Sequence, residues 1–237
     1  QLDALSCENS SMHMGTNSTS YYFSVASGNI GEFFDEMYLN TPWEQHYENL
    51  DGRTILDRLA SVKYFVVKNN RYQYVPYGYY WLEGSAEKNG KIYEAFGSEE
   101  ALPLGYTYDS FIPGEEYEKM TVTEKQQALL QGIVLEDSSL PEITPEFNDQ
   151  EIPYEIRKGK GCSVKDGKIK VTKEGAKLEL LFNGLENSET YLIAEGLDYD
   201  GLSPKDRVSE KKWNKMTRYE QNQLLHEDSH WRYWKES

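Results

Sequence analysis

The stretch RTILDRLASVKYFVV (residues 53–67) decides the fold class of this chain. Its first part, within residues 51–60, repeats apolar residues at the spacing of one helical face and predicts a helix. Its second part, within residues 62–68, is rich in β-branched and aromatic side chains and predicts a buried strand. A helix that leads directly into an apolar strand is typical of α/β and α+β proteins, in which helices cover a sheet.

The residues on both sides of this stretch predict further short helices and strands. Residues 28–39 carry apolar residues at helical spacing after Asn29, a residue type that often caps helices. Residues 92–97 and 104–112 have the composition of short strands. Residues 121–137 predict a helix that begins at a capping threonine. We therefore expect the first half of the chain to be a mixed layer of helices and strands.

After the first 150 residues the apolar pattern changes to alternation. Residues 138–150 contain two prolines and few periodic apolar residues, so they are the best linker candidate. CSVKDGKIKVT (162–172) predicts a hairpin, because Asp-Gly suits a type I′ turn between alternating segments. Residues 176–182 and 189–197 continue the alternation. Several short strands at this spacing predict a β-sandwich.

Together these patterns predict an α+β chain with four parts. A mixed α/β domain comes first, followed by a linker, a β-sandwich-like domain and a C-terminal helix. The predicted bounds are residues 1–137, 138–150, 151–208 and 209–237. The sequence leaves open whether the β-sandwich is complete within this chain.

The charge of the chain is negative and unevenly distributed. The formal net charge is −15. Residues 1–150 hold 9 Lys and Arg against 24 Asp and Glu, whereas residues 151–237 hold 16 of each. A surface this acidic repels phosphate backbones, so we expect no nucleic-acid partner. The uneven distribution supports two units with different surfaces.

The ends and cysteines of the chain give weaker indications of its setting. No run of about eighteen apolar residues is present, so no membrane-spanning helix is predicted within this sequence. The chain begins QLDALS, without Met or a signal peptide, and we expect a processed protein or a domain of a longer one. Cys7 and Cys162 could pair in an oxidising compartment or remain two thiols.

The segment HEDSH near the C-terminus matches the H-E-x-x-H pattern of zinc hydrolases. On a helix, His226 and His230 would share a face as zinc ligands, and Glu227 would act as the general base. A third ligand is still required, and only Glu236 follows at a suitable spacing. The longer pattern with that spacing needs glycine where this chain has Tyr233. We therefore expect a solvated helix end and predict no catalytic residue, metal or cofactor, with a zinc metallohydrolase as the alternative.

Three stretches are distinctive in combination: RTILDRLASVKYFVV (53–67), ALPLGYTYDSFI (101–112) with MTVTEKQQALLQGIVLED (120–137), and NSETYLIAEGLDYDG (187–201). Together they resemble the YfhO family of bacterial multi-pass membrane proteins, over about residues 21–201. That family is linked to glycosylation of lipoteichoic or wall teichoic acids. The resemblance implies a soluble extracellular region beside membrane helices of glycosyltransferase-C type. Catalytic carboxylates of such an enzyme would lie in membrane-proximal loops outside this sequence, so none is assigned here.

A region beside a sugar-transferring site would be expected to contact sugars. Sugar rings pack their C–H faces on aromatic rings, and their hydroxyls need polar partners such as Asp. The candidate carbohydrate-binding residues come from two aromatic segments: Tyr77, Tyr79, Trp81, Tyr106, Tyr108 and Asp109. The alternative is that these tyrosines pack over a core with their hydroxyls at its rim. The acidic first half favours a neutral sugar or a protein partner over a polyanion.

The combined expectation is the extracellular region of a YfhO-like membrane protein that takes part in glycosylation of Gram-positive cell-envelope polymers. The parent protein would be a glycosyltransferase at the extracellular face of the cell membrane, and this region would be non-catalytic. Its partners would be the parent's membrane helices, with sugar or teichoic acid as candidate ligands. Two alternatives remain open: the zinc metallohydrolase described above, and a purely structural ectodomain that assembles with other proteins.

Overall fold

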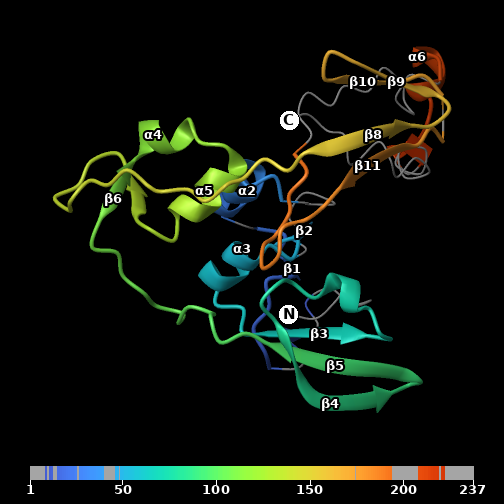
Figure 1. The fold of residues 1–237 in the computed structure, drawn as a ribbon. Helices are drawn as coiled ribbons and strands as arrows, with labels where there is room; N and C mark the ends of the chain where they lie inside the picture. The colour runs from blue at the N-terminus through green and yellow to red at the C-terminus, as the bar shows by residue number, and fades with distance from the viewer. Residues whose placement is uncertain are drawn as a thin grey trace. The chain divides into compact units, whose positions relative to one another are not determined.

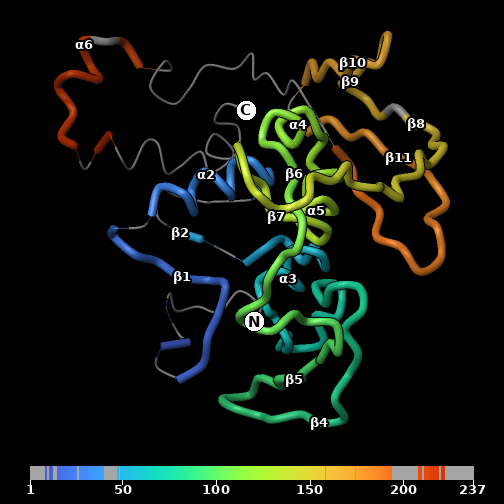
Figure 2. The backbone as a smooth tube through the Cα atoms, turned by 90° about the vertical axis from the view of Figure 1, so that its left-hand side faces the viewer, coloured from blue at the N-terminus to red at the C-terminus, as the bar shows by residue number. Residues whose placement is uncertain are grey.

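The computed structural model of the chain divides into two compact units (Figure 1, Figure 2). The first unit comprises residues 1–145 and 193–237, and the second comprises residues 146–192. The structure describes residues 9, 11–12, 15–25, 27–39, 46–47, 49–173, 175–193, 208–218 and 220–221. Helices and antiparallel sheets are both present, so the predicted α+β class is confirmed.

Several short helices are described in the first unit before residue 146. They are α2 (Gly28–Glu36), α3 (Thr54–Leu59), α4 (Gly114–Glu118) and α5 (Val122–Ala128). A capping box starts α5: the Glu124 amide donates to Thr121 Oγ1 at 3.3 Å, and the Thr121 amide donates to the Glu124 carboxylate at 2.7 Å. The expected cap at Asn29 is wrong, because Ser27 is the capping position of α2 and Asn29 already lies in its first turn.

A three-stranded antiparallel sheet follows α3, with the strand order β3-β5-β4. β3 (Tyr64–Lys68) and β5 (Lys91–Gly97) confirm two predicted strands, and β5 lies in the centre (Figure 1). β4 (Tyr80–Lys88) was not expected and forms a hairpin with β5. The hairpin turns at Asn89 and Gly90, whose φ values of 54° and 69° lie in the left-handed region that an Asn-Gly pair favours.

A parallel pair of short strands, β6 (Phe111–Pro113) and β7 (Ile133–Leu135), replaces two longer expected elements. The strand expected over residues 104–112 is wrong for most of its length, because pairing begins only at the first residue of β6. The helix expected over residues 121–137 ends at Ala128, because the β-branched residues that follow pair with β6 instead. A contact between strands distant in sequence therefore overrides the local helical pattern.

Two further pairings hold distant segments to the first unit. β1 (Tyr21–Tyr22) pairs antiparallel with β2 (His46–Tyr47). The Phe111 amide donates to the Pro141 carbonyl, and the Ile143 amide donates to the Phe111 carbonyl, both at 2.9 Å. The first unit therefore extends beyond β7 along the chain.

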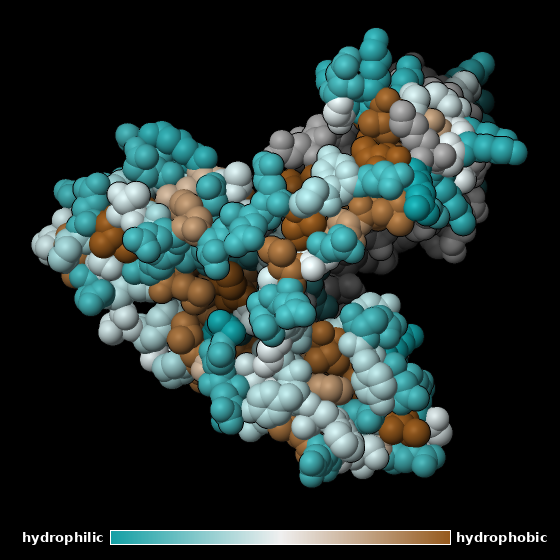
Figure 3. All heavy atoms as spheres, viewed as in Figure 1, coloured by the Kyte–Doolittle hydropathy of each residue, from teal (hydrophilic) through white to brown (hydrophobic). Residues whose placement is uncertain are grey.

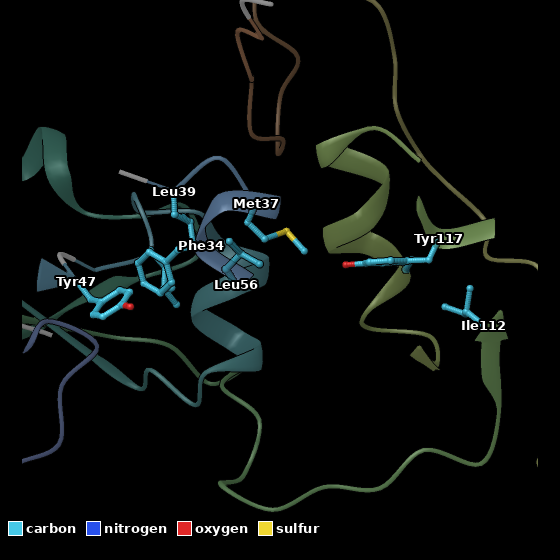
Figure 4. Packing of buried hydrophobic residues seen from close by; sticks show 9 residues of the cluster. Phe34, Met37, Leu39, Tyr47, Leu56, Ile112 and Tyr117 are labelled. Carbon is cyan, nitrogen blue, oxygen red and sulfur yellow. The ribbon is translucent and has the colours of Figure 1, made fainter. Parts of the chain in front are cut away.

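The core of the first unit draws on its helices, β2 and β6 (Figure 4). Nine of the described residues form this buried cluster: Phe34, Met37, Leu39, Tyr47, Leu50, Leu56, Ile112, Tyr117 and Ala128. The rings of Phe34 and Tyr47 meet edge to face with centroids 4.8 Å apart. Figure 4 shows Met37, directly after α2, directed toward Tyr117 of α4. Burying each large side chain contributes about 1.5–3 kcal/mol, so this cluster is the main source of the unit's stability.

The second unit consists of two antiparallel ladders of two strands each. β8 (Tyr154–Lys158) pairs with β11 (Leu178–Phe182), and β9 (Cys162–Lys165) pairs with β10 (Lys168–Val171). None of the residues that the structure describes between 146 and 192 is buried. Two-stranded ladders without a buried face are only marginally stable in water.

The turn of the β9–β10 hairpin confirms the predicted Asp-Gly turn. Asp166 and Gly167 have φ values of 51° and 74°, as a type I′ turn requires. The strand expected over residues 189–197 is wrong for residues 189–193, which are irregular, and its remaining residues lie outside the described part of the chain.

The described residues of the C-terminal segment include the short helix α6 (Glu210–Trp213), and residues 218, 220 and 221 are helical as well. Beyond α6, a second capping box is complete: the Thr217 amide donates to the Glu220 carboxylate at 2.7 Å, and the Glu220 amide donates to Thr217 Oγ1 at 3.3 Å. Among the helices that the structure describes, none is both long enough and apolar enough to span a bilayer.

Candidate functional site

Tyr79, one of the expected sugar-binding residues, has its hydroxyl committed to the backbone. The hydroxyl donates to the Val62 carbonyl at 2.5 Å, and the ring packs edge to face on Phe65 with centroids 6.2 Å apart. Burial raises the pKa of Tyr79 well above its ordinary value, and the negative charge of Asp57 raises it further. Tyr79 therefore holds the connection between α3 and β3 in place.

The second expected aromatic group, Tyr106 and Tyr108, connects two helix ends. The Tyr106 hydroxyl donates to the Leu59 carbonyl at 3.3 Å, at the last residue of α3. The Tyr108 hydroxyl donates to the Leu129 carbonyl at 2.5 Å, just after α5. The two rings meet edge to face at 5.6 Å, so the irregular segment before β6 is fastened to both helices.

The electrostatic setting of Tyr108 agrees with this structural role. Burial raises the pKa of Tyr108 to about 12, and a hydrogen bond with Tyr106 adds to the effect. Asp109, the carboxylate expected to bind sugar hydroxyls, is exposed and accepts a long hydrogen bond of 3.4 Å from Ser110 Oγ. Of Tyr106, Tyr108 and Asp109, the residue whose polar group is most accessible to a ligand is Asp109.

Tyr77 and Trp81 remain open to solvent, with about half of each side chain exposed. The Tyr77 carbonyl accepts a hydrogen bond from Thr54 Oγ1 at 2.7 Å, so the backbone is fixed while the side chain stays exposed. Trp81 lies on β4, an edge strand, opposite Phe96 of β5. These two candidates keep ring surface that a ligand could contact.

One face of the three-stranded sheet presents an aromatic surface in which Tyr64 was not expected from the sequence, whereas Tyr80 belongs to the expected aromatic segment before and within β4. Tyr64 of β3 and Tyr80 of β4 both pair with Gly97 of β5, so the two tyrosines lie on the same face with only a glycine between them. They are 52% and 49% exposed. Leu82 lies over Gly97, where a Cβ atom would come within 3.0 Å of the leucine side chain. We call Tyr64, Tyr80 and Leu82 the outer aromatic face.

Polar groups accompany the outer aromatic face. Burial and a hydrogen bond from its hydroxyl to the Glu99 carboxylate raise the pKa of Tyr80. Lys63 Nζ lies 5.7 Å from the centre of the Tyr64 ring, a cation–π distance. The exposure of Tyr64 could have been predicted from the sequence, because alternation along β3 puts its side chain on the other face from Phe65 and Val67, which are both buried. The prediction of a buried strand over residues 62–68 did not distinguish its two faces.

A hollow of about 330 Å³ in the first unit is the second place where a small ligand could enter. Its walls include Phe33, Tyr117 and Leu129 together with the carboxylates of Glu36 and Glu118. The Glu36 carboxylate is paired with Lys125 Nζ at 2.8 Å, an ion pair that joins α2 to α5.

One stretch of the second unit is basic, although residues 146–192 together hold 9 Asp and Glu against 8 Lys and Arg. Seven exposed basic side chains are described in residues 157–177: Arg157, Lys160, Lys165, Lys168, Lys170, Lys173 and Lys177. Three of them, Arg157, Lys160 and Lys177, line a hollow of about 370 Å³ together with Glu179. Over residues 151–237 as a whole, acidic residues elsewhere cancel this positive charge, so the overall charge pattern did not predict it.

Among the described residues no group of three or more His, Cys, Asp or Glu side chains is arranged to hold a metal ion. His226, Glu227 and His230 lie outside the described residues, so the zinc alternative stays a prediction. Cys162 is a free thiol that donates to the Lys177 carbonyl at 3.2 Å, and Cys7 is not among the described residues.

The sequence as a whole matches a known family of membrane proteins. The model of the family described as "Bacterial membrane protein YfhO" matches residues 3–228. The chain belongs to the YfhO family. The resemblance noted over about residues 21–201 is thus confirmed, and the match extends further than expected at both ends.

Similarity to individual YfhO proteins covers less of the chain. The "Uncharacterized protein YfhO" of Bacillus subtilis (strain 168) is 26% identical over 128 residues, which are 53% of this chain and 14% of that protein. The chain thus matches only a small part of the length of this curated relative. No solved structure matches it. YfhO proteins are bacterial membrane proteins by the family's description, which associates this chain with a membrane.

Proposed function

We propose that this chain is the extracellular region of a YfhO-family protein that takes part in glycosylation of cell-envelope polymers, lipoteichoic or wall teichoic acid. The chain itself is non-catalytic and binds carbohydrate, while the parent protein's membrane helices carry the transfer reaction. Family membership supports the association with a membrane. The observation that carries the binding role is the exposed aromatic surface of the three-stranded sheet.

The outer aromatic face has the chemistry that a sugar ring needs. Tyr64 and Tyr80 present ring surface on one face of a sheet, which is a more rigid support than a loop. The nearby Glu99 carboxylate can accept hydrogen bonds from sugar hydroxyls. Tyr77, one of the residues expected from the sequence, keeps an exposed ring just before β4, whereas Trp81 pairs with Phe96 and lies on the other face of the sheet.

The charge of the first unit selects among cell-envelope ligands. Residues 1–150 carry 24 acidic against 9 basic side chains, which repels a polyphosphate chain. A neutral or cationic sugar, such as a hexose or hexosamine, therefore fits this surface better than the polymer backbone. The same surface could instead contact a protein partner, which is the second outcome of the test below.

Titration of the purified chain with hexoses, hexosamines and short teichoic-acid fragments tests this proposal. We expect weak binding of a neutral or cationic sugar, in the millimolar range that a few stacking contacts provide. Tyr64→Ala and Tyr80→Ala should each weaken it about twofold to tenfold, because one aromatic contact contributes about 0.5–1.5 kcal/mol. Tyr154→Ala removes an equally exposed ring from the second unit and should leave binding unchanged.

Two results would contradict the carbohydrate role. The absence of any binding at millimolar sugar would leave assembly with protein partners as the function. Stoichiometric zinc in the purified protein that is lost in His226→Ala would instead support the zinc metallohydrolase.

A further inference from the structure

We propose that the β9–β10 hairpin docks onto the surface of a bilayer that contains anionic phospholipid headgroups. This interaction is independent of sugar binding, because it uses lysines of the second unit, whereas the proposed sugar site lies in the acidic first unit. It would hold the second unit against the membrane with which the family is associated.

The hairpin has one cationic face and one apolar face. In the antiparallel register Lys165 lies opposite Lys168, and Lys170 opposite Ser163, so three lysines share one face. The alternate residues Ile169 and Val171 lie on the other face, opposite Val164 and Cys162. Alternation of side chains along a strand makes this separation complete over the hairpin.

The apolar face of the hairpin is open. Ile169 is 53% exposed and Val171 is 64% exposed, although β-branched side chains on a strand usually pack against a neighbour. Figure 3 shows hydrophobic and hydrophilic residues next to one another on the visible surface of the strands of the second unit.

The cationic face is unfavourable for the isolated protein. Lys165 and Lys168 are directly opposite across the ladder, and like charges in that position destabilise a hairpin. Neither these two lysines nor Lys170 forms an ion pair with another described residue. An external anion would relieve this repulsion.

The combination of the two faces favours a lipid surface over a soluble polyanion. A phosphate polymer in solution would use the lysines alone and leave Ile169 and Val171 in water. At a bilayer the apolar face enters the boundary of the acyl chains while lysines on the polar face reach the headgroup phosphates. The acidic first unit would be repelled by the same surface, so contact would be restricted to the second unit.

Sedimentation of the full chain with vesicles tests this proposal. We expect binding to vesicles of phosphatidylglycerol mixed with phosphatidylcholine, weak or no binding to phosphatidylcholine alone, and weakening by salt. Lys168→Glu/Lys170→Glu should weaken binding by about thirtyfold or more, because each lysine near an anionic surface contributes about a fivefold factor. Ile169→Ser/Val171→Ser should weaken it by about fivefold through the loss of apolar contact.

The β4–β5 hairpin provides a matched control. Lys88 and Lys91 are paired exposed lysines next to an Asn-Gly turn in the first unit, and Lys88→Glu/Lys91→Glu should leave vesicle binding unchanged. Lys168→Gln/Lys170→Gln repeats the test without introducing acidic residues, with circular dichroism to verify folding. An equal loss in the control variant, or unchanged binding in both variants of the β9–β10 hairpin, would overturn the proposal. Equal binding of soluble polyphosphate, unaffected by Ile169→Ser/Val171→Ser, would also overturn it and indicate a polyanion-binding surface.

Discussion

The two units of this chain are stabilised in different ways. The first unit buries a cluster of nine described residues, with Met37, Leu56 and Ile112 almost fully removed from solvent. The second unit pairs its strands regularly but buries none of its described residues. Regular strand pairing therefore does not by itself provide a core, and the second unit is the one whose surfaces remain open for other molecules.

Removal of a core side chain tests the difference in core burial between the two units. Leu56→Ala should lower the free energy of unfolding of the first unit by about 2–5 kcal/mol, because it deletes a buried leucine and leaves a cavity. Leu180→Ala in β11 is the control and should cost much less, since Leu180 is only partly buried. Chemical denaturation measures both values. Equal losses would show that the second unit has a core comparable to that of the first.

A second test acts on the second unit alone. Gly159 lies so close to the β11 side of the unit that an added Cβ atom would be 2.4 Å from the Lys177 carbonyl oxygen. Gly159→Ala should therefore destabilise the β8–β11 ladder by about 1–3 kcal/mol, as overpacking against backbone does. Amide hydrogen exchange should show faster exchange in that ladder and no change in the first unit. Gly105→Ala, where a Cβ meets no atom within 4 Å, should change neither.

A smaller effect is expected at the cap of α5. Thr121→Ala should lower the free energy of unfolding of the first unit by about 1 kcal/mol, because it removes the hydroxyl that accepts the Glu124 amide. Thr121→Ser keeps this acceptor and should restore most of the stability. Equal losses in both variants would mean that the hydroxyl does not cap the helix.

The smallest expected effect is a pH dependence from Tyr108. Its pKa is raised to about 12 in the folded protein from an ordinary value near 10, so the unfolded state loses the proton first as pH rises. The stabilisation is fully present below pH 10 and should be lost progressively between about pH 10 and pH 12. Tyr108→Phe should flatten this decline in urea titrations, whereas Tyr154→Phe, at an exposed site, should not. An equally steep decline in Tyr108→Phe would assign the effect to other tyrosines.

Local signals in the sequence predicted several helices, strands and turns. The segment 53–67 gave α3 and β3, and the Asp166-Gly167 pair gave the β9–β10 turn. The turn at Asn89-Gly90 carried the same kind of signal, although β4 was not expected. β4 is harder to recognise because its register shifts between Trp81 and Ser85, which interrupts the alternation of side chains.

Features that depend on distant contacts could not be predicted in this way. β7 forms because Ile133 and Val134 meet β6, more than twenty residues earlier in the chain. The hydroxyls of Tyr106 and Tyr108 reach carbonyls that lie 47 and 21 residues away. The tyrosine-rich sequence shows that these rings are present, but only the fold determines which hydroxyls form internal hydrogen bonds and which rings stay exposed to solvent.

Amide hydrogen exchange of the full chain, with and without vesicles containing phosphatidylglycerol, tests the central claim most directly. The account predicts that amides of β3, β5 and α5 exchange far more slowly than those of β8 to β11 in vesicle-free buffer. It further predicts that vesicles slow exchange in β9 and β10 and leave the first unit unchanged. Protection in β8 to β11 equal to that in the first unit without vesicles would contradict the account, because the second unit would then be stable without any partner surface.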